Sequence, residues 1–348
     1  MTTDIELVDK RVRLQSPSSL WPIRVAKLIT FLTFPLIWVG GLVTSTDAGM
    51  AVPDWPTTYG YNMFLYPWET WLLGPWDVFI EHGHRLLGSL VGMVTIVLVV
   101  VVRRFDERPW MRKLVVYALL AVIAQGILGG VRVIENEKLL AMVHGCTGPL
   151  FFALTVVVLT AFTKFWDDPL ESCEAVVDEI HTRLAKPLRL ATITTVLVYV
   201  QLVLGASIRH IPVTASTQTF SMLVVFHVIM GVLVTGHIVA MALNLRQSKG
   251  LAPKIRQSGK WLLGLVLLQV GLGVGTWVLK YGYPLGFGET SLTANHLVVT
   301  YGWWQSHITT AHVATGSLIL INCVLLTTRL QRLRFIADLQ IDRDNDRN

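Results

Sequence analysis

Charged residues are scarce in this chain. Only 15% of its 348 residues are Asp, Glu, Lys or Arg, whereas 53% are hydrophobic, and the mean hydropathy is +0.55. A soluble protein typically carries about a quarter charged residues. Apolar runs of about 20 residues recur along the sequence, which is the length that a helix needs to cross a bilayer. The composition therefore excludes an ordinary soluble domain and predicts an integral membrane protein.

Cysteine is also rare, with three residues in the chain. Cys146 and Cys323 fall within apolar runs, and Cys173 falls in a charged segment expected in the cytoplasm, where thiols stay reduced. A disulfide is therefore not expected. The first residues lack the short apolar core of a signal peptide, and the acidic residues among them are atypical of a mitochondrial transit peptide. We expect a multi-pass protein of a bacterial inner membrane.

Basic residues are missing from one long stretch, since no Lys or Arg lies between residues 28 and 84. They gather in the N-terminal tail, around residues 103–113 and 246–260, and after residue 329. Because cytoplasmic segments are enriched in Lys and Arg, this distribution predicts that both termini are cytoplasmic. The net charge of +6 reflects that bias, and no nucleic-acid partner is expected.

The apolar runs predict an all-α fold with eight transmembrane helices arranged as two repeated four-helix bundles. The helices are expected near residues 24–45, 84–103, 112–132, 142–164, 187–208, 221–244, 260–280 and 307–328. The expected divisions are an N-terminal tail (1–23), a first bundle (24–164), a cytoplasmic linker (165–186), a second bundle (187–330) and a C-terminal tail (331–348).

Histidine phrases repeat between the two halves. His84-Arg-Leu-Leu-Gly corresponds to His227-Val-Ile-Met-Gly, and His144-Gly-Cys-Thr-Gly corresponds to His312-Val-Ala-Thr-Gly. All four histidines lie near the outer ends of helices, at similar depth. Two histidines on facing helices can bind a haem iron axially. The pattern therefore predicts two haem sites, because ionisable residues within a membrane usually serve a function.

Further histidines are assigned no ligand role. His82 and His307 are expected just outside the spans, in contact with solvent, and His210 and His296 are expected in external loops. His237 lies ten residues beyond His227 and is expected on another face of its helix.

Three charged residues accompany the histidines, and each has two interpretations. Glu81, three residues before His84, either acts beside a bound cofactor or is an acid favoured by the helix dipole. Arg132 and Arg209 close helices at the outer surface, where they either bind haem propionates or extend toward the interface. Two external loops, at about 46–80 and 281–305, are rich in Trp, Tyr, Pro and Gly. They either cover a site or anchor the protein at the bilayer surface.

The chain resembles the haem A synthases of bacteria and mitochondria over about residues 24–330. The phrases that carry the resemblance are Val39-Gly-Gly-Leu-Val-Thr-Ser-Thr, Pro53-Asp-Trp-Pro-Thr-Thr-Tyr-Gly, Glu81-His-Gly-His-Arg, Gln201-Leu-Val-Leu-Gly-Ala-Ser-Ile-Arg-His and Ala311-His-Val-Ala-Thr-Gly. The family fold is eight transmembrane helices in two similar bundles. The resemblance implies oxidation of the C8 methyl of haem O to a formyl group, which gives haem A for a terminal oxidase.

The resemblance also implies roles for individual residues. Glu81 would be the catalytic-site glutamate, and His84 with His144 would hold the haem that is oxidised. His227 and His312 would hold a haem b that passes electrons. Arg85, which belongs to the Glu81-His-Gly-His-Arg phrase, is expected to bind the cofactor together with Arg132 and Arg209. A haem O synthase is the expected partner, together with a membrane electron donor, and a homo-oligomer is left open.

The chain departs from many bacterial members of the family, because it has no cysteine pair in the first external loop. That absence excludes thiol redox chemistry at this place. Two other functions remain open from the sequence. A di-haem electron-transfer protein would use the same histidines without Glu81, and a haem-binding assembly factor would need no oxygenase activity.

Overall fold

A computed structural model describes residues 18–348 apart from 172, 174–176, 249, 284–296 and 346–348. It is helical, and its long elements are α2 (Trp21–Ser45), α4 (Trp76–Phe105), α5 (Pro109–Ile134), α6 (Lys138–Thr160), α8 (Val177–Arg209), α9 (Thr217–Gln247), α10 (Pro253–Tyr281) and α11 (Trp303–Asn345). All eight are long and apolar enough to cross a membrane, as the sequence predicted.

Shorter elements lie in two of the connections between these helices. Between α2 and α4 the chain forms strands β1 (Thr57–Thr58) and β2 (Tyr61–Asn62), the 3-10 turn η1 (Met63–Leu65) and helix α3 (Trp68–Leu72). The two strands pair antiparallel. Helix α7 (Lys164–Asp167) lies between α6 and α8.

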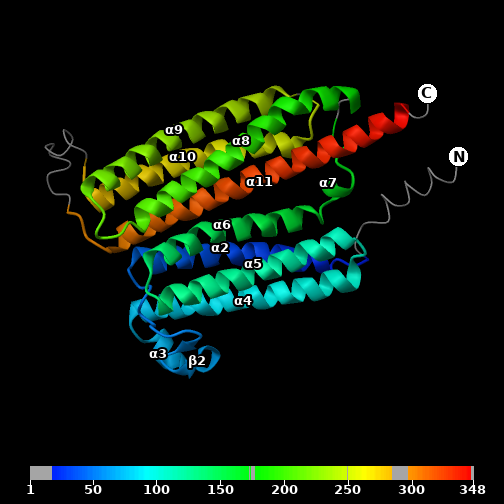
Figure 1. The fold of residues 1–348 in the computed structure, drawn as a ribbon. Coiled ribbons are helices and arrows are strands. Elements are labelled where there is room, and N and C mark those ends of the chain that lie inside the picture. The colour runs from blue at the N-terminus through cyan, green and yellow to red at the C-terminus, as the bar shows by residue number, and fades with distance from the viewer. Residues whose placement is uncertain (1–17, 172, 174–176, 249, 284–296, 346–348) are drawn as a thin grey trace.

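The long helices gather in two groups of four (Figure 1). In the first group α2 contacts α4, α4 contacts α5, α5 contacts α6, and α6 returns to α2. The second group closes in the same way through α8, α9, α10 and α11. Each group has its own apolar core, one around Ile29, Leu98 and Met111 and the other around Ile238, Leu262 and Leu320. Helix α11 joins the groups by contacting α2 and α6.

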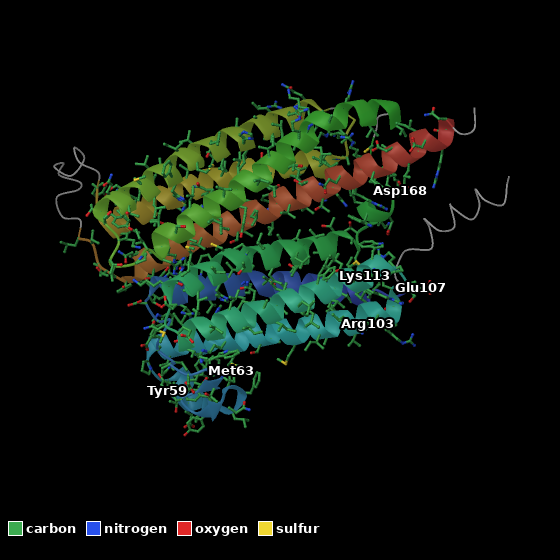
Figure 2. The ribbon with its side chains drawn as sticks, viewed as in Figure 1. Tyr59, Met63, Arg103, Glu107, Lys113 and Asp168 are labelled. Atoms are coloured by element: carbon green, nitrogen blue, oxygen red, sulfur yellow. The ribbon has the colours of Figure 1, made fainter. Side chains whose placement is uncertain are left out.

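Polar and charged residues differ between the two ends of the molecule. The β1–β2 hairpin and α3 lie at one end of the helices, and α7 lies at the other (Figure 1). Tyr59 and Met63 lie at the first end, whereas Arg103, Glu107 and Lys113 lie at the α7 end (Figure 2). Ser18 donates a backbone hydrogen bond to the Phe105 carbonyl at the α7 end, where α11 also ends.

Several helices are longer than the sequence indicated. Helix α4 begins at Trp76 instead of near residue 84, because Pro75 precedes it and Asp77 in its first turn is favoured by the helix dipole. Helix α11 continues to Asn345 instead of ending near 328, because Leu330, Leu333 and Ala337 extend its buried stripe at helical spacing. Hydropathy alone misses both extensions, since their residues are too polar for a membrane span.

The expected linker at 165–186 is also partly helical, because α8 starts at Val177 and continues through Pro187. The external loop expected at 281–305 falls largely outside the described residues, and so does His296.

Candidate functional site

Two pairs of imidazole rings face each other, one in each group of helices. The ring centres of His84 on α4 and His144 on α6 are 6.4 Å apart, with planes at 85°. Those of His227 on α9 and His312 on α11 are 6.3 Å apart, with planes at 71°. The structure therefore brings together the residues that the family resemblance paired, one pair from each half of the chain.

The four histidines lie inside their helices and not at the first residue. His84 lies eight residues after the start of α4, and His144 lies six residues after the start of α6. His227 lies ten residues after the start of α9, and His312 lies nine residues after the start of α11. At 1.5 Å per residue, each imidazole sits roughly 10–15 Å along its helix. Helices α4 and α6 begin at Trp76 and Lys138 instead of near residues 84 and 142, so His84 and His144 lie deeper in their helices than the sequence predicted.

A glycine on the preceding long helix makes room for each imidazole. A Cβ atom on Gly40 would lie 2.7 Å from Cε1 of His84, and one on Gly129 would lie 3.2 Å from Cε1 of His144. Gly205 and Gly273 stand in the same relation to His227 and His312, at 3.1 Å each. Because any side chain at these positions would push on the ring, the glycines define where each imidazole lies.

The relation is reciprocal, because a glycine four residues after each histidine contacts the helix that accommodates the ring. Gly148 lies against Gln125, Gly231 against Gln201, and Gly316 against Gln269. In the first pair of helices Gly88 lies against Leu36 instead. Four helix pairs thus share one packing pattern. The first helix of each pair presents a glutamine or leucine and, four residues later, a glycine that faces the histidine. The second helix presents the histidine and, four residues later, a glycine that faces the glutamine or leucine.

Backbone carbonyls from the same partner helices face the imidazoles. The Nδ1–H of His312 donates to the Gln269 carbonyl at 3.2 Å. The carbonyls of Leu36, Gln125 and Gln201 lie toward the rings of His84, His144 and His227, whose buried Nδ1 atoms fall short of hydrogen-bonding geometry. A carbonyl can only accept, so it favours the tautomer with a proton on Nδ1 and a lone pair on Nε2. In His227 this Nε2 lies 3.3 Å from the side-chain amide nitrogen of Gln201, which can donate to it.

The pairs fit a metal with two axial imidazoles. With metal–nitrogen bonds of about 2 Å and roughly 1 Å from ring nitrogen to ring centre, two such imidazoles have centres about 6 Å apart. Within the described residues no group of three or more His, Cys, Asp or Glu side chains could hold a metal ion. A haem iron suits this donor set, because its macrocycle supplies the other ligands.

Glu81 is buried on α4, three residues before His84. Its side chain is 1% exposed, and both carboxylate oxygens are hydrogen-bonded. Oε2 accepts from the backbone N–H of Val52 at 2.8 Å, and Oε1 accepts from Nη2 of Arg85 at 3.0 Å. Glu81 therefore lies well inside the helix, beyond the first turn where a dipole effect alone would place it.

Arg85 binds the connection between α2 and α4. Its Nη1 donates to the carbonyls of Asp54 and Thr57 at 2.6 and 3.0 Å, and its Nη2 donates to the Val52 carbonyl at 2.6 Å. With the contact to Glu81, both terminal nitrogens are occupied. Only Nε–H remains for another acceptor.

The two other predicted arginines also bind backbone carbonyls. Arg132 donates from Nη1 to Gly49 at 3.2 Å. Arg209, at the end of α8, donates from Nη2 to the Gly41 carbonyl at 2.5 Å and to the Ser45 hydroxyl at 2.7 Å, both on α2. Arg209 thereby links the two groups of helices beside the histidine pairs.

The segment that Arg85 binds is folded on itself. The Asp54 carboxylate accepts from the backbone N–H groups of Tyr59 and Gly60 at 2.8 and 2.9 Å. Burial raises the pKa of Asp54, but hydrogen bonds from Gly60, Thr57 and Tyr59 outweigh it and hold the pKa below its usual value. The Tyr59 hydroxyl donates to the Ala51 carbonyl.

His82 corrects one expectation. It was expected outside the span and solvated, but it is 1% exposed on α4. Its Nδ1 lies 3.1 Å from the Thr58 hydroxyl, and its ring contacts Tyr66 and Trp71. His307 likewise lies inside a helix, in the second turn of α11, with its ring 3.8 Å from that of Trp303. His82 was misplaced because α4 begins earlier than hydropathy indicated. His307 stays partly exposed, as expected, although it lies within α11.

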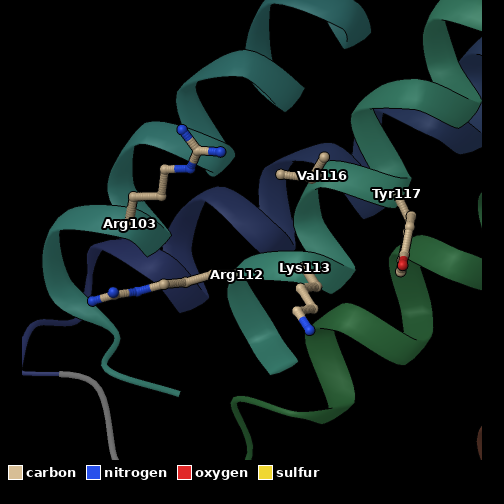
Figure 3. Close-up of a pocket in the computed structure, with 5 residues that line it drawn as sticks. All are labelled: Arg103, Arg112, Lys113, Val116 and Tyr117. Atoms are coloured by element: carbon tan, nitrogen blue, oxygen red, sulfur yellow. The ribbon is translucent and has the colours of Figure 1, made fainter. Parts of the chain in front are cut away.

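A basic pocket of about 400 Å³ lies at the other end of the molecule. Its lining residues belong to α4 and α5 and are Arg103, Arg112, Lys113, Val116 and Tyr117 (Figure 3). It is remote from the histidine pairs, because Arg103 and Lys113 lie at the end opposite the β1–β2 hairpin (Figure 2).

The sequence did not indicate two features of the site. On α5, α8 and α10 a glutamine lies four residues before the glycine that faces a histidine. Leu36 and Gly40 take the equivalent places on α2, but the sequence did not indicate this because leucine replaces the glutamine. The contact between Trp55 and Gly130 was also missed, although the paired glycines Gly129-Gly130 were a signal of close approach.

Comparison with known proteins agrees with the site. A family model described as cytochrome oxidase assembly protein matches residues 76–222, which include Glu81, His84 and His144. Curated proteins named heme A synthase are also similar. That of Shouchella clausii is 28% identical over 56% of this chain and 61% of its own length. That of Symbiobacterium thermophilum is 28% identical over 51% and 55%, and that of Lysinibacillus sphaericus is 30% identical over 50% and 54%.

The chain spans a little over half the length of these relatives. The resemblance predicted from the sequence motifs is confirmed over that part. Across about half of its residues, this chain with eight membrane-length helices is similar to proteins named heme A synthase.

Proposed function

We propose that this chain is a haem A synthase, which oxidises the C8 methyl of haem O to a formyl group by successive hydroxylation. The observation that carries the proposal is that two histidine pairs occur, one in each group of helices. The ring centres within each pair are 6.4 and 6.3 Å apart, and both pairs are built from the same helix packing. The relatives named heme A synthase support the same reaction. The haem A would serve assembly of a terminal oxidase, in line with the matching family description.

The two pairs take different roles in this proposal. His84 and His144 hold the haem that is oxidised, and His227 and His312 hold a haem b that passes electrons from a membrane donor. The Gln269 carbonyl that accepts from Nδ1 of His312 fixes the orientation of that imidazole and raises its basicity as a ligand. Iron in the bound haem supplies the oxidation chemistry.

Charged residues near the first pair orient the substrate and act on its charge. Glu81 places a buried negative charge one turn from His84, where it stabilises positive charge that develops at the rim of the macrocycle. Arg132 and Arg209 offer guanidinium N–H groups to the propionates at the mouth of the site. Arg85 contributes through Nε alone, since loop carbonyls and Glu81 occupy its other nitrogens.

The proposal includes a topology. The two groups of helices are repeated four-helix bundles, residues 24–164 and 187–330, with residues 165–186 between them. Both termini are cytoplasmic in a bacterial inner membrane, which places the histidine pairs toward the external face. Haem O synthase is the proposed supplier of the substrate, and the chain acts alone or as a homo-oligomer.

Pyridine haemochrome analysis tests the function. The full chain is co-expressed with a haem O synthase, purified, and its extracted haems are identified. Haem A or its hydroxylated precursor alongside haem B is the expected result. Haem B alone would refute the synthase in favour of a di-haem electron-transfer protein, and haem O bound without any oxidised product would indicate a carrier or assembly factor.

A further inference from the structure

One segment of the connection between α2 and α4 bridges two helices of the first group. This segment, residues 49–60, is called the strap below. It is bound to α4 through Glu81 and Arg85 and to α5 through Gly130 and Arg132. These helices supply or accommodate both histidines of the first pair, so the strap lies across the site and not beside it.

On α4 the strap is anchored by a buried ion pair. Arg85 donates to three strap carbonyls, and Glu81 accepts from one strap N–H, at distances from 2.6 to 3.0 Å. The side chains are 8% and 1% exposed, so little water competes for these groups. Hydrogen bonds to charged groups are stronger than those between neutral groups. The anchor therefore fixes the strap backbone in one position.

On α5 the strap is held by ring packing against a glycine. A Cβ atom on Gly130 would lie 2.2 Å from Cδ2 and 2.3 Å from Cε2 of Trp55. Real Cβ atoms do not approach other heavy atoms so closely, so even alanine would displace the indole. The bare backbone of Gly130 is thus the surface on which Trp55 rests.

Both attachment points adjoin the histidine pair in sequence and in space. Gly129, next to Gly130, faces His144, and Arg85 directly follows His84. Arg132, one turn from Gly129, donates to the Gly49 carbonyl at the start of the strap. The strap is therefore held by the same two helices that carry His84 and accommodate His144.

We propose that the strap retains the substrate haem at the first histidine pair. Trp55 positions the strap by packing on the backbone of Gly130, and Arg85 anchors the strap to α4. This inference rests on the proposed function of that pair. A closed strap excludes water from the reacting edge and slows release of the partly oxidised macrocycle. Glu81 then has two roles, because it accepts a hydrogen bond from the strap and also supplies a negative charge beside the first histidine pair.

Hydrogen exchange of the full chain in nanodiscs tests the strap without any haem chemistry. We expect Gly130→Ala to speed exchange of the amides in residues 49–60 at least tenfold, since Trp55 loses its seat. Gly126→Ala is the matched control, because Gly126 lies one turn earlier on α5 with nothing within 4 Å of its Cβ position. Equal exchange in wild type and Gly130→Ala would overturn the proposal.

Haem release separates this inference from the proposed function. Haem transfer from the loaded protein to excess apomyoglobin should be about tenfold faster in Gly130→Ala for the first site and unchanged for the second site. Unchanged release from the first site, despite faster amide exchange, would refute the retention role. A protein with wild-type retention but no haem A product would refute the proposed function and leave the strap standing.

Discussion

At the scale of single residues, the site depends on groups that have few alternative partners. Glu81 is hydrogen-bonded through both oxygens, and Arg85 through both terminal nitrogens. Removing one partner of such a buried pair leaves the other uncompensated, which costs about 3–5 kcal/mol. Conservative substitutions are therefore the informative ones, because truncations disturb folding and chemistry together.

Glu81→Gln should keep haem binding and lose most conversion of haem O to haem A, with build-up of the alcohol. The amide keeps the shape of the carboxylate but removes the negative charge that the reaction needs. Extracted haems and amide exchange of the strap are measured on the same preparation. Wild-type conversion would show that Glu81 is not catalytic. Lost conversion accompanied by fast strap exchange would show that it acts through the strap alone.

His227→Ala or His312→Ala should abolish the b-type spectrum, because each removes one imidazole of a pair that is 6.3 Å across. The first pair lies in a separate group of helices, so its haem binding should survive. Optical spectra and haem-to-protein ratios of both variants provide the measurement. Full b-haem occupancy in either variant would remove that residue from the proposed ligands.

The histidines could be predicted from the sequence because each belongs to a short phrase that repeats in order. The partner atoms could not. The Leu36 carbonyl and the seat of Trp55 on Gly130 depend on which helices become neighbours, and residues distant in the chain carry no local pattern. His82 was misjudged for a related reason, since its burial follows from the Thr58 and Tyr66 contacts of a folded connection.

At the scale of elements, the unit of the fold is a pair of neighbouring helices with a glycine facing each histidine. Small residues allow helices to approach closely in a membrane, where apolar burial gives no preference for protein over lipid. The same geometry occurs in α2 with α4, α5 with α6, α8 with α9, and α10 with α11. A glutamine lies four residues before the glycine in three pairs, and a leucine lies there in the fourth, so the pairs are similar but not equivalent.

Gly40→Ala should weaken haem binding at the first pair more than Gly273→Ala weakens it at the second. The added methyl would lie 2.7 Å from the His84 ring but 3.1 Å from the His312 ring, so only the first requires a large shift. Overpacking of this kind costs about 1–3 kcal/mol, which is a loss of affinity of about fivefold to 150-fold. Haem titration of the apoprotein measures both affinities.

Gly92→Ala and Gly271→Ala are the controls for this comparison, because nothing lies within 4 Å of either Cβ position. They should bind haem as the wild type does. If Gly40→Ala also binds like the wild type, the glycine does not set the position of the His84 ring.

The boundaries of the helices could be predicted from the sequence only in part, since hydropathy does not reveal the polar first turns of α4.

At the scale of the whole molecule, the two groups of helices meet along α11, which contacts both α2 and α6. Arg209 strengthens this junction from α8 by binding Gly41 and Ser45 on α2, and Ser306 of α11 donates to the Ser45 carbonyl. The hydroxyl of Thr310 lies 3.0 Å from that of Ser45. Polar contacts therefore concentrate where the end of α2 meets the second group, beside both histidine pairs.

The count of eight spans and the charge bias were available from the sequence, because both depend on composition alone. The closing of each group into a ring was not, since it requires knowing which helices are neighbours. The proposed orientation follows from the bias of the sequence, and two of the basic residues that carry it, Arg103 and Lys113, lie at the α7 end of the molecule (Figure 2). All assignments of the site to the external face depend on that orientation.

Cysteine labelling with a membrane-impermeant maleimide tests the orientation. Leu65 is 75% exposed in the connection between α2 and α4, and Glu107 is exposed between α4 and α5 at the other end. In a Cys173→Ser background, with Cys146 and Cys323 buried, Leu65→Cys should be labelled in intact cells. Glu107→Cys should be labelled only after the membrane is opened. The reverse pattern would place the strap and both histidine pairs toward the cytoplasm, and the basic segments would then lie outside, against the positive-inside rule.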